Sequence, residues 1–174
     1  ILNKKMDFER WDNLEQVLDE YKNAFQAGLQ EHLQKDGSNA SYSLLNSIEM
    51  KVEVDEKVYS VHCSLLDYYK YLDEGTQPHK KKGDGTFVKM IKKWILVKPV
   101  KPYPTANGKL PTVDQLTFLI SRKIRLNGTK GTKFFTNTKE QINEVYKDKI
   151  KSAIKKDIRI NLKEYLNQLS NKYN

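Results

Sequence analysis

The chain has 174 residues, a formal net charge of +9 and one cysteine. This length suits one domain with its own core, and a lone cysteine cannot form an internal disulfide, so a disulfide scaffold is excluded. The longest fully apolar run, Trp94 to Val97, is far shorter than the roughly 20 residues that span a bilayer. The start shows no secretory signal pattern, so we expect synthesis in a reducing cytoplasm and no membrane contact.

Charge is distributed unevenly along the chain. Residues 1–77 contain 8 Lys and Arg against 15 Asp and Glu, whereas residues 78–174 contain 23 against 7. Such asymmetry suggests an electrostatic partner for each half, which could be nucleic acid, another protein or another copy of the same chain.

The first predicted element is a helix over residues 10–34. Its apolar residues recur every three or four positions, at Trp11, Leu14, Leu18, Tyr21, Phe25, Leu29 and Leu33. This spacing places them on one stripe of a helix whose opposite face is mostly acidic. Asp36-Gly37 is expected to end the helix, and residues 38–45 form either a second short helix or a loop.

A β-hairpin is predicted next, because two segments alternate apolar and polar residues with the period of a strand. The alternating apolar positions are Ile48, Met50, Val52 and Val54, then Tyr59, Val61, Cys63 and Leu65. Residues 55–57 are expected to form the turn. The predicted fold is therefore α+β, a small antiparallel sheet built on this hairpin and packed with several helices.

An aromatic-rich segment over residues 65–76 follows the hairpin. We expect a short helix closed by Gly75, because glycine adopts the left-handed C-cap conformation that a residue with a Cβ disfavours. Residues three and four apart share a helix face, so Tyr68, Tyr71 and Leu72 are expected to pack this helix onto the sheet.

The next region is basic and rich in proline. Residues 78–85 are expected to form an exposed loop, and Thr86 is expected to cap a helix with Lys89, Lys92 and Lys93 on its outer face. The expected buried positions of that helix are Phe87, Met90, Ile91, Trp94 and Ile95. Residues 98–111 contain four of the five prolines, which predicts an extended connector.

Two further helices complete the predicted fold. Thr112 to Gln115 fits a capping box that opens a helix ending at Asn127-Gly128, with an expected buried stripe of Val113, Leu116, Leu119, Ile120 and Ile124. The loop that follows leads to Phe134-Phe135, which are expected to anchor it to the core.

From Thr138 onward, apolar residues step mainly by four without proline or glycine, which predicts one long helix of about 45 Å at roughly 1.5 Å per residue. The stepping residues are Ile142, Tyr146, Ile150, Ile154, Ile158, Leu162, Leu166 and Leu169. Residues 157–163 also alternate like a strand, so both readings stay open there. We predict a single domain over residues 1–174, in which residues 150–174 could protrude as a helical arm.

No catalytic, cofactor-binding or metal-binding constellation is predicted. His62 and Cys63 are neighbours on a strand and point to opposite faces, so they cannot jointly bind a metal. Asp73-Glu74 would need a sheltered pocket to act as general acid and base. His32 and His79 lie in separate segments, and no phosphate-binding glycine motif is present. We therefore expect a protein that is not an enzyme and has no cofactor.

Lysines dominate residues 78–110, which contain nine of them against the single acid Asp84. Such a surface attracts phosphate without reading base sequence, although a run of charge is more often simply a solvated face. The candidate DNA-facing residues are Lys80, Lys81, Lys82, Lys89, Lys92 and Lys93. No helix-turn-helix, zinc-finger or aromatic RNA-binding motif is present, so base-specific readout is not expected.

Several short motifs occur in a characteristic order over about residues 10–150. An aromatic helix ends in Glu74-Gly75-Thr76, a later helix carries Phe87, Ile91 and Trp94, and an arginine-bearing helix leads to Gly128-Thr129. The motif residues to be located in the structure are Tyr68, Tyr71, Glu74, Gly75, Thr76, Phe87, Trp94, Gly128, Phe134 and Phe135. This order resembles the neck or tail-completion proteins of tailed bacteriophages.

The resemblance implies a small α+β subunit without catalytic residues that assembles in a ring below the portal. Its implied partners are copies of itself, neighbouring connector and tail proteins and, without sequence preference, viral DNA. The implied location is the virion, after synthesis in the bacterial cytoplasm. Alternatives are a tail terminator, another tail component or a cytosolic nonspecific DNA-binding protein. The loop at residues 80–85 and the proline-rich connector look longer than in the family.

In a cyclic ring, each subunit presents one surface to a different surface of its neighbour. We therefore expect an acidic face to meet a basic face. The acidic candidates are Asp12, Glu15, Asp19 and Glu20, and the basic candidates are Lys147, Lys151, Lys155 and Lys156. Exposed ion pairs are individually worth only about 0 to 1 kcal/mol, so their effect would lie in register and partner choice.

Overall fold

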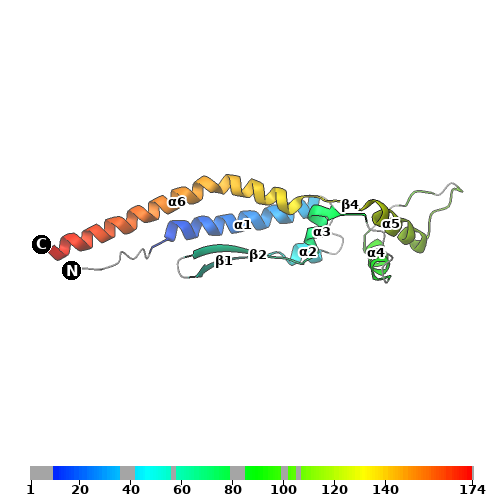
Figure 1. Ribbon diagram of the computed structural model, residues 1–174, viewed down its shortest axis with the longest axis horizontal. Coiled ribbons are helices and arrows are strands. Elements are labelled where there is room, and N and C mark those ends of the chain that lie inside the picture. Colours follow the sequence, from blue (N-terminus) through cyan, green and yellow to red (C-terminus); the bar gives the residue numbers. More distant parts are fainter. Residues whose placement is uncertain are drawn as a thin grey trace. The chain divides into compact units, whose positions relative to one another are not determined.

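The computed structural model describes residues 10–35, 42–55, 58–78, 85–98, 102–104 and 107–173 (Figure 1). It confirms the predicted α+β class, with a small antiparallel hairpin and long helices near both ends of the chain. The chain divides into two compact units. The first unit comprises residues 1–28, 49–64 and 137–174, and the second comprises residues 29–48 and 65–136.

Helix α1 spans Asp12–Lys35 and confirms the first prediction. Five residues of the predicted stripe are buried: Leu14, Leu18, Phe25, Leu29 and Leu33. The predicted stop at Asp36-Gly37 lies outside the described residues. Helix α2 covers Ser43–Asn46, so the end of the uncertain segment 38–45 is helical, and residues 38–41 lie outside the described chain.

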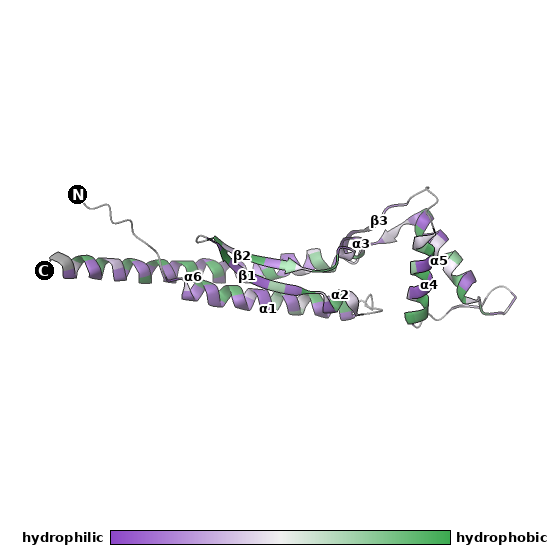
Figure 2. Ribbon diagram, turned by 90° about the horizontal axis from the view of Figure 1, so that it is seen from below, coloured by the Kyte–Doolittle hydropathy of each residue, from purple (hydrophilic) through white to green (hydrophobic). Residues whose placement is uncertain are grey.

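The hairpin is formed by β1 (Glu49–Asp55) and β2 (Val58–Ser64), as predicted. In its antiparallel register Met50 lies opposite Cys63, Val52 opposite Val61 and Val54 opposite Tyr59, so the apolar positions share one face. Tyr59 of the hairpin lies against Trp11, just before α1, with ring centroids 6.4 Å apart, and its hydroxyl donates to Glu15 of α1. The hairpin and α6 both lie beside α1 in the first unit (Figures 1 and 2).

Helix α6 spans Phe134–Tyr173, so residues 157–163 are helical and the strand alternative is wrong. The predicted stripe is only partly correct, because Ile158, Leu162 and Leu166 are exposed. A residue turns about 100° in a helix of 3.6 residues per turn, so steps of four drift by about 40° each. The buried positions follow a mixture of steps instead, at Tyr146, Ala153, Asp157 and Asn161.

The second unit contains the short helix α3 (Tyr69–Glu74), the two-residue strands β3 (Gly75–Thr76) and β4 (Thr129–Lys130), and the helices α4 and α5. Helix α4 covers Thr86–Val97 and α5 covers Val113–Asn127. The capping box of Thr112 and Gln115 and the stop at Gly128 are confirmed. Gly85, and not Thr86, occupies the N-cap position of α4.

The buried faces of α4 and α5 differ from the predicted ones. On α4, Ile95 is buried, whereas Met90 and Trp94 are exposed. On α5, Val113 and Leu119 are exposed, and the buried side chains are those of Thr117 and Ser121. Helices α4 and α5 pack against each other, and several large apolar residues of both helices remain exposed. Figure 2 shows hydrophobic residues on both helices.

Candidate functional site

The glycine–threonine motifs of the sequence meet in one place, which we call the junction. Gly75 pairs with Lys130 and Thr76 with Thr129 in the antiparallel ladder of β3 and β4. The hydroxyl oxygens of Thr76 and Thr129 lie 2.9 Å apart, and the backbone N–H of Thr129 donates to Thr76 Oγ1 at 3.1 Å. Two motifs separated by about fifty residues therefore form a single structural unit.

The junction requires glycine at two positions where its backbone segments approach each other closely. Gly75 has φ +83° and Gly128 has φ +71°, a region that a residue with a Cβ seldom adopts. Gly75 is the C-cap of α3, as predicted, but its ψ of −169° leads directly into β3, so the predicted left-handed conformation is wrong. A Cβ on Gly75 would collide with the carbonyl oxygen of Thr129, and one on Gly128 with that of Thr76.

Asp73 connects the junction to the start of α6. Its buried carboxylate accepts hydrogen bonds from the backbone N–H of Phe135 at 2.8 Å and from the Thr136 hydroxyl at 2.6 Å. It thereby satisfies an N–H in the first turn of a helix, which has no partner within the helix itself. The sequence prediction missed this role, since Asp73 was considered only with Glu74 as a possible general acid and base. Its spacing before Gly75 carries no distinctive signal.

The aromatic residues of α3 are arranged differently from the prediction. Tyr68 and Tyr71 are exposed, and α3 packs against the start of α6. Tyr69 is the contacting residue, with its ring centroid 5.1 Å from that of Phe135. Tyr69 and Asp73 are four positions apart and share the inner face, whereas Tyr68 and Tyr71 project from other sides.

The remaining motif residues divide between buried and exposed positions. Phe134 is buried at the start of α6 and confirms the predicted anchor, and Phe87 is half-buried on α4. Glu74 is exposed at the end of α3. The conformational requirement of the junction therefore falls on Gly75, Gly128 and Asp73 more than on the aromatic residues.

The structure describes only part of the predicted DNA-facing set. Lys89, Lys92 and Lys93 are exposed on α4, as predicted, and the amine of Lys92 lies 2.6 Å from a carboxylate oxygen of Asp114 on α5. Lys80, Lys81 and Lys82 lie outside the described residues. The described lysines of α4 thus form a basic surface in which one member is already paired.

The predicted acidic face on α1 is exposed, but its carboxylates have partners within the chain. Asp12 pairs with Arg10 at 2.9 Å, Asp19 pairs with Lys22 at 2.7 Å, and Glu15 accepts a hydrogen bond from the Tyr59 hydroxyl at 3.0 Å. Glu20 accepts a weaker bond from Gln16 at 3.4 Å. These contacts compete with any partner that would pair with the same carboxylates.

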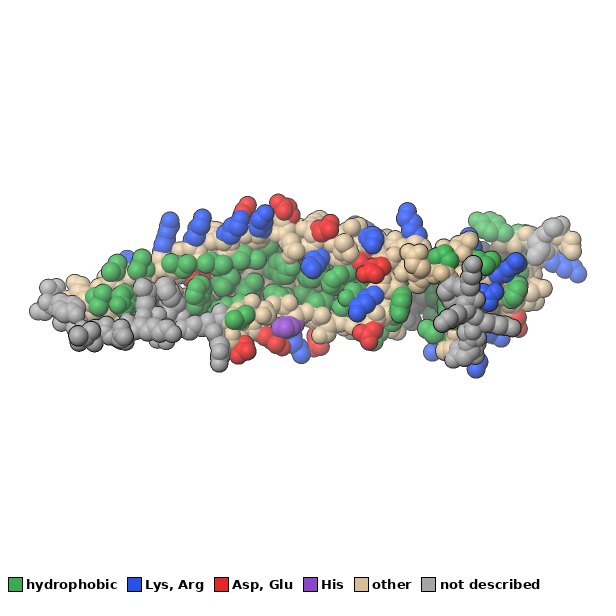
Figure 3. Space-filling model, viewed as in Figure 1, with side chains coloured by type: hydrophobic (Ala, Val, Ile, Leu, Met, Phe, Trp, Pro, Cys, Tyr) green, Lys and Arg blue, Asp and Glu red, His purple; other side chains and the backbone are tan. Residues whose placement is uncertain are grey.

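The predicted basic face on α6 is also exposed, at Lys147, Lys151, Lys155 and Lys156. Lys and Arg side chains stand out along α6 in the space-filling view (Figure 3). Lys151 lies 3.4 Å from Asp148. The pairing of this face with the α1 face of another copy stays a prediction.

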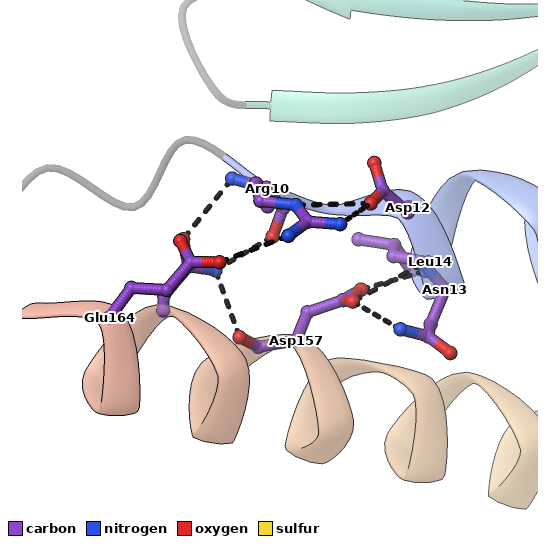
Figure 4. Close-up of polar contacts among 7 residues, drawn as sticks. Arg10, Asp12, Asn13, Leu14, Asp157 and Glu164 are labelled. Atoms are coloured by element: carbon purple, nitrogen blue, oxygen red, sulfur yellow. Dashed lines mark hydrogen bonds and ion pairs between the residues drawn. The ribbon is translucent and has the colours of Figure 1, made fainter.

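A buried polar cluster fixes the beginning of α1 against α6 (Figure 4). The Asp157 carboxylate accepts hydrogen bonds from Leu14 N at 2.8 Å and from Asn13 Nδ2 at 2.6 Å. The Asn161 side-chain amide donates to the Arg10 carbonyl at 2.7 Å, and the Arg10 guanidinium pairs with Glu164 at 2.9 Å. This cluster could not be predicted from the sequence, because its members lie about 150 residues apart along the chain.

The histidine and cysteine side chains considered as catalytic or metal-binding candidates do not lie together. His62 is exposed and lies 3.4 Å from Glu53, whereas Cys63 is half-buried on the opposite face of the hairpin. Burial raises the pKa of the Cys63 thiol, which disfavours the reactive thiolate. His32 lies near the Phe134 carbonyl, and His79 is outside the described residues. Within the described ranges, no three His, Cys, Asp or Glu side chains are placed to bind a metal ion.

Comparisons with known proteins identify no relative of this chain. No family model, no curated protein and no solved structure matches it. Among the described residues, no helix is both long and apolar enough to cross a membrane.

Proposed function

We propose that this chain is a structural protein of the neck of a tailed bacteriophage, where it forms a ring that links portal-proximal proteins to the tail around the DNA channel. The observation that carries this proposal is the junction. The motifs Glu74-Gly75-Thr76 and Gly128-Thr129, which underlie the resemblance to neck and tail-completion proteins, pair with each other as β3 and β4. This pairing supports reading them as one shared structural feature.

The arrangement of the polar and charged side chains is compatible with a structural role. The buried carboxylates of Asp73 and Asp157 accept hydrogen bonds from backbone N–H groups at the starts of two long helices. A carboxylate used in this way stabilises the fold and is not presented to a substrate. The prominent exposed features are charged faces and apolar side chains, which are suited to contacts with macromolecules.

Electron microscopy of particles that carry a tagged copy of the chain tests the proposal. We expect label in a ring at the head–tail joint, with several copies in each particle. The untagged particle, stained in the same way, is the control. Label on the capsid shell, on fibres or along the tail tube would contradict a neck location, and one or two copies per particle would contradict a closed ring.

A second function, nonspecific DNA binding, is favoured by the exposed lysines of α4. Lys89 and Lys93 are exposed on the same helix, and contacts of lysine with phosphate release counterions. We expect weak binding that is indifferent to base sequence and falls steeply as salt rises. Filter binding over a salt series measures this dependence, and K89E/K93E should weaken binding equally for every DNA sequence. An affinity independent of salt would contradict the proposal.

A further inference from the structure

The β1–β2 hairpin has two open edges. In the described part of the chain its sheet holds only these two strands, so each strand is paired on one side alone (Figure 2). The unpaired side of a strand presents a row of backbone N–H and C=O groups that another strand can bind. The hairpin therefore carries two surfaces suited to an added strand, one on β1 and one on β2.

The strand register identifies the backbone groups on each open edge. Asp55 pairs with Val58 across a connection of two residues. The wide pairing pattern would need a bond between those two neighbouring residues, so Asp55 and Val58 are hydrogen-bonded to each other. Pairs of the two kinds alternate along antiparallel strands. The residues whose backbone groups point away from the hairpin are therefore Met50, Val52 and Val54 on β1 and Tyr59, Val61 and Cys63 on β2.

These outward backbone groups have no hydrogen-bond partner in another element among the described residues. The side chains of the same residues form the apolar face of the hairpin, and this face is incompletely covered. Val52, Val61 and Cys63 are half-buried, and Val54 is exposed. A strand added at either edge would therefore complete a hydrogen-bond ladder and extend an apolar face at the same time.

The two edges differ in the partner that they fit. Two β1 edges paired antiparallel about Val52 would set Glu49 opposite Asp55 of the other copy, and like charges directly opposite each other are destabilising. Two β2 edges avoid that repulsion but leave both β1 edges open. A β2 edge against a β1 edge uses every outward group. It also repeats a combination that already forms within the chain, in which apolar residues lie opposite each other and His62 lies 3.4 Å from Glu53.

We infer that the open edge of β2 pairs antiparallel with the open edge of β1 in the next copy, with Val61 opposite Val52 as in the hairpin itself. The contact joins two different surfaces and is therefore heterologous, so it closes into a ring when the rotation between copies allows. A closed ring of hairpins leaves no open strand edge. The inference rests on the proposed function for the ring, and it names the contact that would hold neighbouring copies together.

Disulfide trapping tests this register. Directly opposed residues of a hydrogen-bonded pair have Cα atoms about 5.5 Å apart, within the roughly 4.4–6.8 Å that a disulfide spans. Two populations of the full chain, C63S/V61C and C63S/V52C, are mixed at high concentration under mild oxidation. Each chain carries one thiol, so every disulfide joins two copies. We expect the V61C–V52C disulfide to exceed each like-with-like product several-fold more than random pairing of equal populations gives.

C63S/E53C is the matched control for C63S/V52C. Glu53 follows Val52 on β1 and is exposed, but its side chain lies on the opposite face of the hairpin. Random collisions favour the more exposed E53C thiol, whereas strand pairing favours V52C. The inference is overturned if E53C forms a disulfide with V61C as readily as V52C does. It is equally overturned if the V61C–V61C product dominates, which indicates paired β2 edges, or if no disulfide forms.

A proline adds a test of the backbone groups themselves. C63P/V61C differs from C63S/V61C in lacking the outward N–H of residue 63, and proline is tolerated at a strand edge where its missing N–H faces away from the partner strand. We expect C63P to lower the yield of the disulfide with V52C several-fold. Circular dichroism checks that the chain is folded. An unchanged yield from folded C63P/V61C would show that the open edge of β2 is not part of the contact.

The outcomes separate this inference from the proposed function. If the disulfide is absent but label is found in a ring at the head–tail joint, the strand pairing is wrong and the neck proposal stands. If the disulfide forms as expected but the chain is absent from the joint, the strand pairing stands and the neck proposal fails.

Discussion

The first unit buries large apolar side chains, whereas the α4–α5 helix pair exposes several of them. In the first unit, Leu14, Phe25 and Tyr146 are buried between elements of the same chain. In the helix pair, Leu96, Phe118 and Leu119 are exposed while Thr117 and Ser121 are buried. The difference teaches that the spacing of apolar residues does not by itself predict whether an apolar face is covered by the same chain. One region covers its apolar side chains with its own chain, and the other leaves its large apolar side chains exposed.

The most direct test of this comparison replaces one phenylalanine in each region by alanine. Phe25 is 5% exposed and Phe118 is 62% exposed. Phe25→Ala should lower the free energy of unfolding by about 3–5 kcal/mol, because it leaves a cavity in a packed core. Phe118→Ala should change it by less than about 0.5 kcal/mol, as for most exposed sites. Urea unfolding followed by circular dichroism measures both, and equal losses would show that Phe118 belongs to a core.

The junction offers a second test, in which two glycines with the same φ are compared. Gly75 has φ +83° and Gly85 has φ +85°, but only Gly75 lacks room for a Cβ. Gly85→Ala should cost about 1–2 kcal/mol for the left-handed backbone alone. Gly75→Ala should cost at least about 3 kcal/mol, since it also separates β3 from β4 and disrupts their hydrogen bonds. Thermal unfolding of the two variants gives the difference.

A matching cost for the two glycine variants would contradict the close approach at the junction. The backbone hydrogen bonds that Gly75→Ala is expected to disturb are specific. Thr132 N donates to the Leu72 carbonyl at 2.9 Å, and Lys133 N donates to the Asp73 carbonyl at 3.0 Å. Hydrogen exchange at these two amides should accelerate in Gly75→Ala and stay unchanged in Gly85→Ala.

The elements that could be predicted from the sequence are those with a strong local pattern. Helix α1, the hairpin and the capping box at Thr112 depend on periodicity or on residues three positions apart, and all three are confirmed. The faces of α3 and α5 could not be predicted in the same way. A six-residue helix such as α3 is too short to define a stripe, and the burial of the polar residues Thr117 and Ser121 on α5 is not indicated by apolar spacing.

The buried aspartates show a second limit of sequence reasoning. Asp73 and Asp157 are acidic residues in polar surroundings and resemble ordinary surface carboxylates. Their burial depends on helix starts that lie 62 and 143 positions away in the sequence. No spacing rule connects residues so far apart. The polar contacts at the starts of both long helices therefore could not be predicted from the sequence.

Asp157 gives a third test, which addresses how the first unit is held together. Asp157→Ala should cost about 2 kcal/mol, because it removes a cap from α1 and leaves the buried N–H of Leu14 unsatisfied. Asp157→Asn keeps one acceptor and should cost about half as much. Asp148→Ala is the matched control on the same helix; its carboxylate is exposed and pairs with the exposed Lys151, so the loss should be below about 0.5 kcal/mol. Similar stabilities of the Asp157 and Asp148 variants would contradict the capping role.

Tyr59 provides the smallest and most specific test of the contact between the hairpin and α1. Burial, followed by the hydrogen bond to Glu15, raises the pKa of Tyr59 to about 12. The unfolded chain loses this phenolic proton near its ordinary pKa of about 10. Between these values the folded state binds more protons than the unfolded state, so the free energy of unfolding must fall as pH rises from about 10 to about 12.

Replacing the phenol isolates this contribution from the titration of the lysines. Tyr59→Phe should show a shallower loss of stability between pH 9 and pH 11 than the unaltered chain, because the variant lacks the proton that is linked to folding. At neutral pH the same variant should lose only about 0.5–1 kcal/mol, the usual net value of one hydrogen bond. Glu15→Gln should give an intermediate slope, since it removes the charge that disfavours the phenolate but leaves the burial. If Tyr59→Phe and the unaltered chain lose stability in parallel above pH 10, Tyr59 is not held against α1 in solution, and the first unit is less completely closed by its own chain than its buried residues indicate.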